Sequence, residues 1–155
     1  MNEAIIANWN TIINPTNQVY ILGDVSFTSN GETVRLLKRL NGIKHLIVGN
    51  HDKALCRDHT FKSEFESIND YLELKYNKRY ICMFHFPIES WNRKHHNAIH
   101  LHGHMHSVNP EILTQRRMDV GLDSNNLVPY SIETIFAIMD KVVTDNICHH
   151  GRSPS

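Results

Sequence analysis

The sequence of 155 residues lacks the features that mark disulfide-rich, membrane-spanning, secreted or strongly charged proteins. Its three cysteines (Cys56, Cys82 and Cys148) form no CxxC pair, which argues against a disulfide framework and fits a reducing compartment. No apolar run approaches the roughly 20 residues of a membrane helix, and the opening MNEAIIANWN lacks the regions of a secretory signal. Neither sign of charge is in excess, because 16 basic residues balance 16 acidic ones. We therefore expect a cytoplasmic protein without membrane attachment or a stable nucleic-acid complex.

The apolar and polar residues alternate in a way that predicts one α/β domain. Hydrophobic residues make up 41% and charged residues 21% of the chain, as in an ordinary globular domain. Periodicity predicts helices over 2–13, 33–40 and from 131 onward, and strands over 18–22, 44–48, 70–76, 80–85, 98–102 and 117–120. The helix–strand alternation of the first 50 residues favours a largely parallel sheet. We expect one domain over residues 1–143 and a flexible C-terminal tail over 144–155.

Histidine is abundant, with 12 residues, six of which fall between His95 and His106. Four predicted strands also end in polar motifs: Gly23-Asp24, GNHD at 49–52, FHFP at 84–87 and GHMH at 103–106. Ligand sites of open α/β sheets lie outside the carboxyl ends of their strands. The carboxylate, amide and imidazole groups of these motifs form a mixed oxygen and nitrogen set that suits Mn, Fe, Zn, Ni or Co. The sequence therefore predicts a divalent metal site at this edge.

The order of these motifs resembles the calcineurin-like metallophosphoesterase superfamily, in particular its small phage and bacterial members. The segments FHFPIESWNRKHH, IHLHGHMH and RMDVGLDSN carry the resemblance, which extends to about Val142. The resemblance implies a four-layer αββα sandwich with a two-metal hydrolase site. It implies that Asp24 bridges the metals, that Asn50, His85 and His104 bind the second metal, and that His106 binds the first. His51 matches the non-ligand histidine beside the scissile phosphate, which makes it the candidate catalytic residue.

The sequence departs from the family pattern at its start. The family opens with a strand that ends in DxH and gives the first metal two ligands, and no DxH precedes Asp24. Either the opening segment has been lost through a late gene start or a cut, or the protein is a shortened form without its first strand. The first metal of a shortened form would keep only Asp24 and His106, fewer than the three protein ligands usual in catalytic zinc sites. A missing strand would also leave backbone groups unpaired, so we expect reduced stability or a strand-exchanged or other homo-oligomer.

The resemblance implies hydrolysis of phosphomonoester or phosphodiester bonds, with a phosphodiesterase favoured, by a metal-bound hydroxide. The substrate would be a small phosphate ester or a nucleotide, and Mn²⁺ is the favoured cofactor, with two ions in a complete site and one in a shortened site. The alternative is a catalytically impaired domain that binds metal or serves as a scaffold. Trp91 has two open interpretations, as a wall of the substrate pocket or as part of the core. His102 is expected either behind the metal ligands or as a packing residue.

Overall fold

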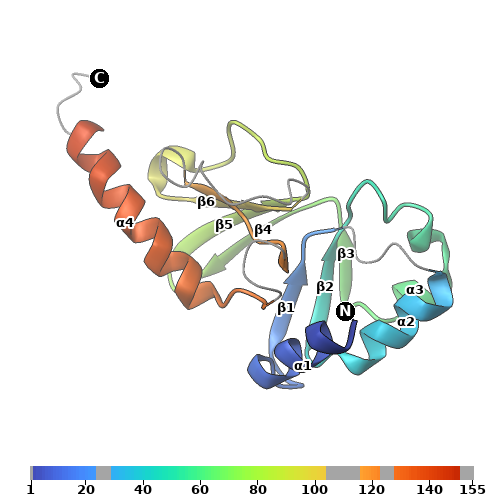
Figure 1. Cartoon of the computed structure of the whole chain (residues 1–155). Coiled ribbons are helices and arrows are strands. Elements are labelled where there is room, and N and C mark those ends of the chain that lie inside the picture. The colour runs from blue at the N-terminus through green and yellow to red at the C-terminus, as the bar shows by residue number, and fades with distance from the viewer. Residues whose placement is uncertain (1, 24–28, 104–115, 123–127, 151–155) are drawn as a thin grey trace.

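The computed structural model describes residues 2–23, 29–103, 116–122 and 128–150. The helices are α1 (Asn2–Ile12), α2 (Asn30–Arg39), α3 (His59–Lys62) and α4 (Ile132–His150), with short 3₁₀ turns η1 (Leu55–Arg57) and η2 (Lys94–His96). The strands are β1 (Gln18–Ile21), β2 (Ile43–Ile47), β3 (Ser67–Asn69), β4 (Tyr71–Tyr76), β5 (Arg79–Phe84), β6 (Ile99–His102) and β7 (Arg117–Asp119). They form two sheets whose positions relative to the helices are visible in Figure 1.

The first sheet is parallel, with strand order β1-β2-β3. Gln18 pairs with Ile43 at its start and Ile21 with Leu46 at its end, so β1 and β2 end side by side. The second sheet is mixed, with order β4-β5-β6-β7. β4 and β5 form an antiparallel hairpin, whereas β5, β6 and β7 run parallel. The fold is therefore α+β, with one parallel and one mixed sheet flanked by helices.

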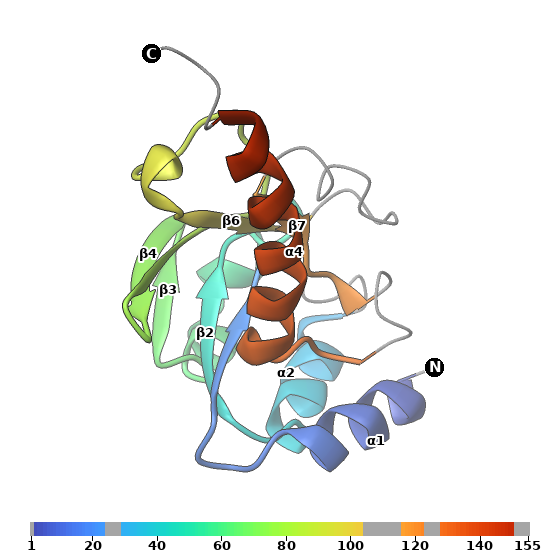
Figure 2. The ribbon, with the colours of Figure 1, turned by 90° about the vertical axis from the view of Figure 1, so that its left-hand side faces the viewer.

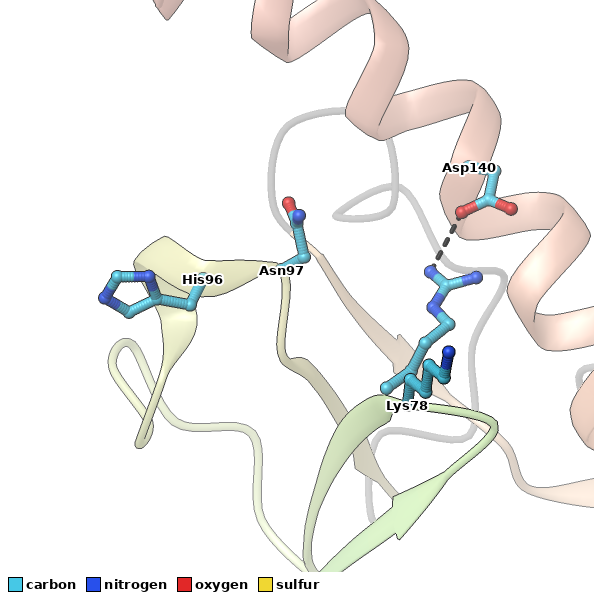
Figure 3. A pocket seen from close by; sticks show the side chains of 5 residues that line it. Lys78, His96, Asn97 and Asp140 are labelled. Atoms are coloured by element: carbon cyan, nitrogen blue, oxygen red, sulfur yellow. Dashed lines mark ion pairs between the residues drawn. The ribbon is translucent and has the colours of Figure 1, made fainter.

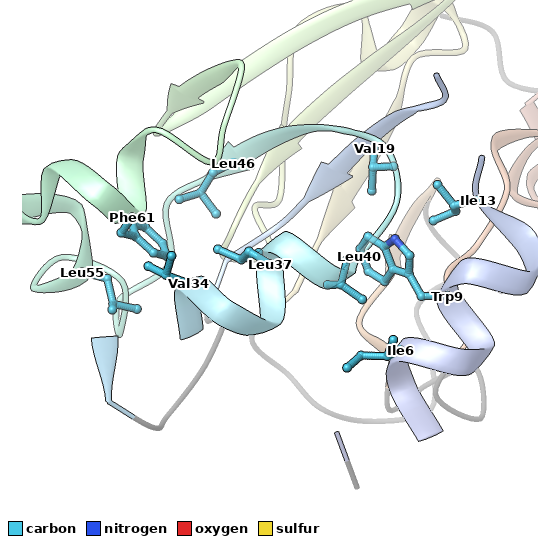
Figure 4. Packing of buried hydrophobic residues seen from close by; sticks show 10 residues of the cluster. All are labelled: Ile6, Trp9, Ile13, Val19, Val34, Leu37, Leu40, Leu46, Leu55 and Phe61. Carbon is cyan, nitrogen blue, oxygen red and sulfur yellow. The ribbon is translucent and has the colours of Figure 1, made fainter. Parts of the chain in front are cut away.

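The helices of the first half cover one face of the parallel sheet (Figure 4). Alternation along β1 sends Val19 toward these helices and Tyr20 toward the other sheet, as the period of two in a strand requires. The helix side forms a core of ten buried residues: Ile6, Trp9, Ile13, Val19, Val34, Leu37, Leu40, Leu46, Leu55 and Phe61. The Trp9 indole N–H donates to the Asn41 carbonyl at 2.8 Å, which ties α1 to the end of α2.

A second core joins the two sheets to α4. Leu22 and Ile47 from the first sheet pack with Ile81 and Met83 of β5, and with Ile135 and other apolar residues of α4. Figure 2 shows α4 running beside the sheets. The other face of β5 carries Cys82, which packs with Trp91 and Ala98 in a third, smaller cluster. The two sheets are thus one packed unit, and their contact positions the strand ends that the sequence singled out.

The C-terminal helix is longer than the sequence analysis expected. α4 continues to His150, so the backbone of 144–150 is helical, and the flexibility expected for the tail over 144–155 stays a prediction. Its sequence explains the difference, because neither glycine nor proline interrupts the chain between Ile132 and His150, and Gly151 follows directly. Within the four described ranges, no helix is long and apolar enough to cross a membrane.

Candidate functional site

The candidate site lies where the carboxyl ends of the two sheets meet. β1 leads into Leu22-Gly23, and β2 leads into Gly49-Asn50, both at the edge of the parallel sheet. β5 leads directly into His85 at the edge of the mixed sheet. Hydrogen bonds connect His85 to both Leu22 and Asn50. The strand ends of both sheets therefore contribute to one locus, as the motif order predicted.

The imidazole of His85 is buried, and its orientation is fixed from one side. Its Nδ1 lies 2.7 Å from the carbonyl oxygen of Leu22, and a carbonyl can only accept. Nδ1 therefore carries the proton, and in the neutral ring Nε2 holds the lone pair. An Nδ1–H bond to a backbone carbonyl is a common means by which proteins orient a metal-binding histidine and fix its tautomer.

Close backbone packing leaves this ring no room to turn. A Cβ at Gly23 would lie 2.4 Å from Nδ1 of His85 and 2.7 Å from Cα of Gly49, and φ of Gly23 is +92°. A side chain at Gly23 would thus collide with the ring and with the neighbouring backbone. Gly103 reaches His85 from the other direction, because its amide donates to the His85 carbonyl at 3.0 Å. Glycine at position 23 is required by both the φ value and the available space.

Asn50 is held by the turn that follows β2. The Asp52 carboxylate accepts from the Gly49 amide at 2.8 Å, and the Asp52 amide donates to the Gly49 carbonyl at 3.1 Å. Asp52 is fully buried, so this double link closes a rigid turn in which Asn50 and His51 lie at the tip. The turn brings Oδ1 of Asn50 to 2.9 Å from Nε2 of His85.

The apposition of Asn50 and His85 has a chemical consequence. With Nδ1 protonated, Nε2 of a neutral His85 is an acceptor, and the facing Oδ1 of Asn50 is also an acceptor. Two lone pairs 2.9 Å apart repel unless a positive charge lies between them or the Asn50 amide turns to present its N–H₂ group to the ring. A proton on Nε2 meets this need, and so does a cation bound by both atoms. The donor pair, one imidazole nitrogen and one amide oxygen, suits a borderline divalent metal.

The structure brings together two of the predicted metal ligands, Asn50 and His85, although they are 35 residues apart in sequence. The predicted catalytic residue His51 is exposed and directly follows Asn50 in the turn. The other predicted ligands (Asp24, His104 and His106) lie outside the described residues. Within the described ranges, no group of three or more histidine, cysteine, aspartate or glutamate side chains is arranged to hold a metal ion.

Further histidines lie behind the site, inside the mixed sheet. His100 is fully buried, its Nδ1 donates to the Cys82 carbonyl at 3.0 Å, and its Nε2 accepts from the Ile88 amide at 3.2 Å. Burial, supported by the neighbouring His102 and Arg117, lowers the pKa of His100 to about 4. His100 is therefore a neutral structural histidine at pH 7, and its two ring nitrogens are both used.

The structure shows the positions of His102 and Trp91, whose roles the sequence left undecided. His102 is fully buried, with Nδ1 2.9 Å from the carbonyl oxygen of Gly103, next to the loop that carries two predicted ligands. Trp91 is 7% exposed, and its indole N–H donates to the Ala98 carbonyl at 2.9 Å. It packs on the face of β5 that points away from the parallel sheet. Trp91 therefore belongs to the core and does not line the candidate site.

Sequence reasoning missed one contributor to the site and left a second one undecided. The Leu22 carbonyl orients His85, and no side-chain motif reports a backbone oxygen. Asp52 closes the turn beneath Asn50, whereas the sequence alone left open whether it orients the loop or His51. One signal was available, because an aspartate three residues after a glycine at the end of a strand can accept from the backbone amides of a turn.

Comparison with known proteins places the fold and names no activity. No protein-family model matches the chain. The chain is 29% identical over 151 residues to an uncharacterized protein of Methanocaldococcus jannaschii, MJ1445, and the match covers 91% of this chain and 76% of that protein. The crystal structure of AQ665, a protein of unknown function from Aquifex aeolicus, is similar with a TM-score of 0.70 and 23% identity, and the match covers 88% of this chain and 84% of the other. This likeness supports the fold, and the function must be argued from the residues of the site.

Proposed function

We propose that the protein is a divalent-metal-dependent phosphoesterase, with a calcineurin-like αββα sandwich, that hydrolyses phosphate esters at the joined carboxyl ends of its two sheets. The observation that carries the proposal is the apposition of Nε2 of His85 and Oδ1 of Asn50 at 2.9 Å, with Nδ1 of His85 committed to the Leu22 carbonyl. Two acceptors that converge from different sheets would form half of a metal coordination shell. The Gly23-Asp24 and GHMH motifs would supply the remaining donors, Asp24, His104 and His106.

The residues present fit a metal of the borderline class. Asn50 and His85 would hold one cation together with Asp24 and His104, and Asp24 would share a second cation with His106. When bound, two such cations lower the pKa of a water molecule to generate the nucleophile and neutralise the charge of the phosphoryl group. We favour Mn²⁺ and a phosphodiester substrate, as the family resemblance suggests.

The chain's own residues would then complete the chemistry. His51 lies exposed at the tip of the turn beside Asn50, where a phosphate ester held at the site would have its leaving oxygen within reach. A protonated His51 would donate to that oxygen as the ester bond breaks, a contribution worth about 10²–10⁴-fold in rate for a general acid. Asp52, below it, keeps the turn in place and contacts no substrate.

Hydrolysis of bis-p-nitrophenyl phosphate by the purified protein with added Mn²⁺ tests the proposal. His51→Ala should lose at least 100-fold in rate and keep its Mn²⁺ affinity, within the range for a lost general acid of about 10²–10⁴. Asn50→Ala and His85→Ala should lose Mn²⁺ binding, measured by calorimetry. The matched control is His59→Ala, since His59 is also exposed but lies at the start of α3.

Two results would count against this assignment. Undiminished activity in Asp24→Ala and His85→Ala would show that the reaction occurs elsewhere in the protein. Mn²⁺ bound at this site without turnover of phosphodiesters or phosphomonoesters would instead favour a metal-binding or scaffolding domain.

A further inference from the structure

A pocket of about 310 Å³ lies at the tip of the β4–β5 hairpin (Figure 3). Its lining comes from three separate parts of the chain: Lys78 and Arg79 at the hairpin, His96 and Asn97 at the end of η2, and Asp140 on α4. The volume is at the lower end of the range typical of small-molecule sites. The sequence does not predict this pocket, because Lys78 and Asp140 in its walls are 62 residues apart (positions 78 and 140).

This pocket is distant from the candidate metal site. Arg79 is the first residue of β5, and His85 directly follows the last residue of the same strand. A strand of six residues spans roughly 20 Å, so the two locations are at opposite ends of the mixed sheet. A ligand in the pocket would not contact His85 or Asn50, and the inference below does not depend on the proposed function.

The backbone around the pocket has an unusual feature. Among the described residues, the non-glycine residues with positive φ are Asn77, Lys78, Arg93 and Asn97, and two of them line the pocket. Asn77 and Lys78 form a two-residue hairpin loop with φ of 49° and 66°, where glycine is preferred at the second position. Asn97 ends η2 with φ of 69°, where glycine is also the usual residue.

A side chain at a position that favours glycine costs conformational energy and calls for a reason. Lys78 carries an ammonium group to the mouth of the pocket, and Asn97 carries an amide to the facing wall (Figure 3). Oδ1 of Asn97 accepts from the Arg116 guanidinium at 3.2 Å, which leaves the amide N–H₂ group as the donor for a ligand. Both strained positions therefore present hydrogen-bond donors to the same space.

The charge of the lining favours an anion. The carboxylate of Asp140 is paired with Arg79 at 2.9 Å, and the Arg79 guanidinium also stacks on the Phe136 ring at 4.1 Å. The negative charge in the wall is thus neutralised by a guanidinium held in a fixed position. Lys78 forms no ion pair with any residue that the structure describes, and it leaves the pocket with net positive charge.

We propose that this pocket binds the phosphate group of a small anion, either free phosphate or a phosphate monoester. Lys78 supplies the charge, Asn97 supplies amide donors, and Arg79 adds a guanidinium N–H directed by its pair with Asp140. Ammonium, guanidinium and amide donors together are the usual partners of phosphate oxygens. His96 also contributes to the lining of the pocket.

The proposal is tested by titrating the full chain with inorganic phosphate, ribose 5-phosphate and adenosine monophosphate at low salt. EDTA removes cations from the distant metal site, and ¹H–¹⁵N spectra locate the binding. Lys78→Gly should weaken binding at least tenfold and Asn97→Gly about fivefold, while both variants keep or raise the Tm, because glycine relieves the strained φ. Lys62→Ala, which removes an exposed charge on α3, should change binding less than twofold, and so should His85→Ala.

The outcomes separate the proposal from its rivals. A stronger response to ribose 5-phosphate or adenosine monophosphate than to phosphate identifies a monoester as the ligand, a weaker response identifies free phosphate, and equal responses show that the phosphate group alone is recognised. Each of these rankings supports the pocket when Lys78→Gly weakens binding. The proposal is overturned if none of the three probes shifts the Lys78 and Asn97 signals at 10 mM, if Lys62→Ala weakens binding as much as Lys78→Gly, or if binding disappears in His85→Ala.

Discussion

Replacing Gly23 by alanine should dismantle the candidate site while a matched glycine replacement leaves it intact. The new Cβ would lie 2.4 Å from Nδ1 of His85, 2.7 Å from Cα of Gly49 and 2.8 Å from the Gly49 nitrogen. Two of these neighbours are backbone atoms, so rotation of a side chain cannot relieve the collision. The His85 ring must move, and its hydrogen bond to the Leu22 carbonyl is then lost.

The expected loss of stability follows from two effects. Holding alanine at a φ of +92° costs about 1–2 kcal/mol. Leaving a buried donor or acceptor without its partner costs about 1–3 kcal/mol more. The free energy of unfolding should therefore fall by roughly 2–5 kcal/mol, and Tm by on the order of 10 °C for a chain of this length.

Gly42→Ala provides the control. Gly42 has a φ of +112°, and a Cβ there would lie 2.5 Å from a methyl group of Val19 and 3.1 Å from one of Ile13. The stability loss should be similar, but the strain falls in the helix-side core, away from His85. Calorimetry at a temperature where both variants are folded should show Mn²⁺ affinity lowered at least tenfold in Gly23→Ala and unchanged in Gly42→Ala. If both variants bind Mn²⁺ equally well, or if Gly23→Ala is as stable as the parent protein, the described packing around His85 is incorrect.

Three further predictions concern the residues behind and beneath the site. Burial lowers the pKa of His100 to about 4, so protonation of His100 opposes folding. The free energy of unfolding should therefore fall as the pH drops from about 6.5 toward 4, by about 2 kcal/mol at pH 5. Urea unfolding measures this loss, and an NMR titration midpoint of His100 near 6.5 would contradict the prediction. Asp52→Ala leaves the Gly49 amide without its acceptor, so the free energy of unfolding should fall by about 1–3 kcal/mol and the Mn²⁺ affinity should fall as well. Asp58→Ala, which removes the cap of α3, should lower stability and leave the Mn²⁺ affinity unchanged. Trp91→Ala should cost about 3–5 kcal/mol in denaturant unfolding and leave Mn²⁺ affinity unchanged, since a drop in affinity would place this ring at the site after all.

Much of the fold could be predicted because its elements have clear periodicity. The strands expected over 18–22 and 44–48 correspond to β1 and β2, and those expected over 70–76 and 80–85 correspond to β4 and β5. The short strand β3 and helix α3 were not predicted. β3 has three half-buried residues, too few for an alternating pattern, and it exists because its backbone pairs with β2. Tertiary pairing, which the local sequence does not record, decides such elements.

The candidate site could also be predicted in part. A motif at a strand end reports which residue types are available, and the parallel arrangement of strands brings their ends to one edge. This reasoning correctly anticipated that Asn50 and His85 meet. It could not anticipate the hydrogen bond from His85 to the Leu22 carbonyl, because that contact depends on how the two sheets are packed. The same reasoning did not predict the pocket at the tip of the β4–β5 hairpin, because its walls come together only through tertiary structure.

The division of the chain between the two sheets has a consequence for assembly. Among the described residues, every strand of the parallel sheet precedes Asp70, and every strand of the mixed sheet follows it. Leu22 and Asn50 therefore belong to one half of the polypeptide and His85 to the other, so their geometry exists only once the halves have associated. Any ligand that contacts both halves stabilises their association. At a ligand concentration of 100 times its Kd, the associated form would be stabilised by about 2.7 kcal/mol. Resistance to proteolysis between the halves should consequently rise with ligand concentration.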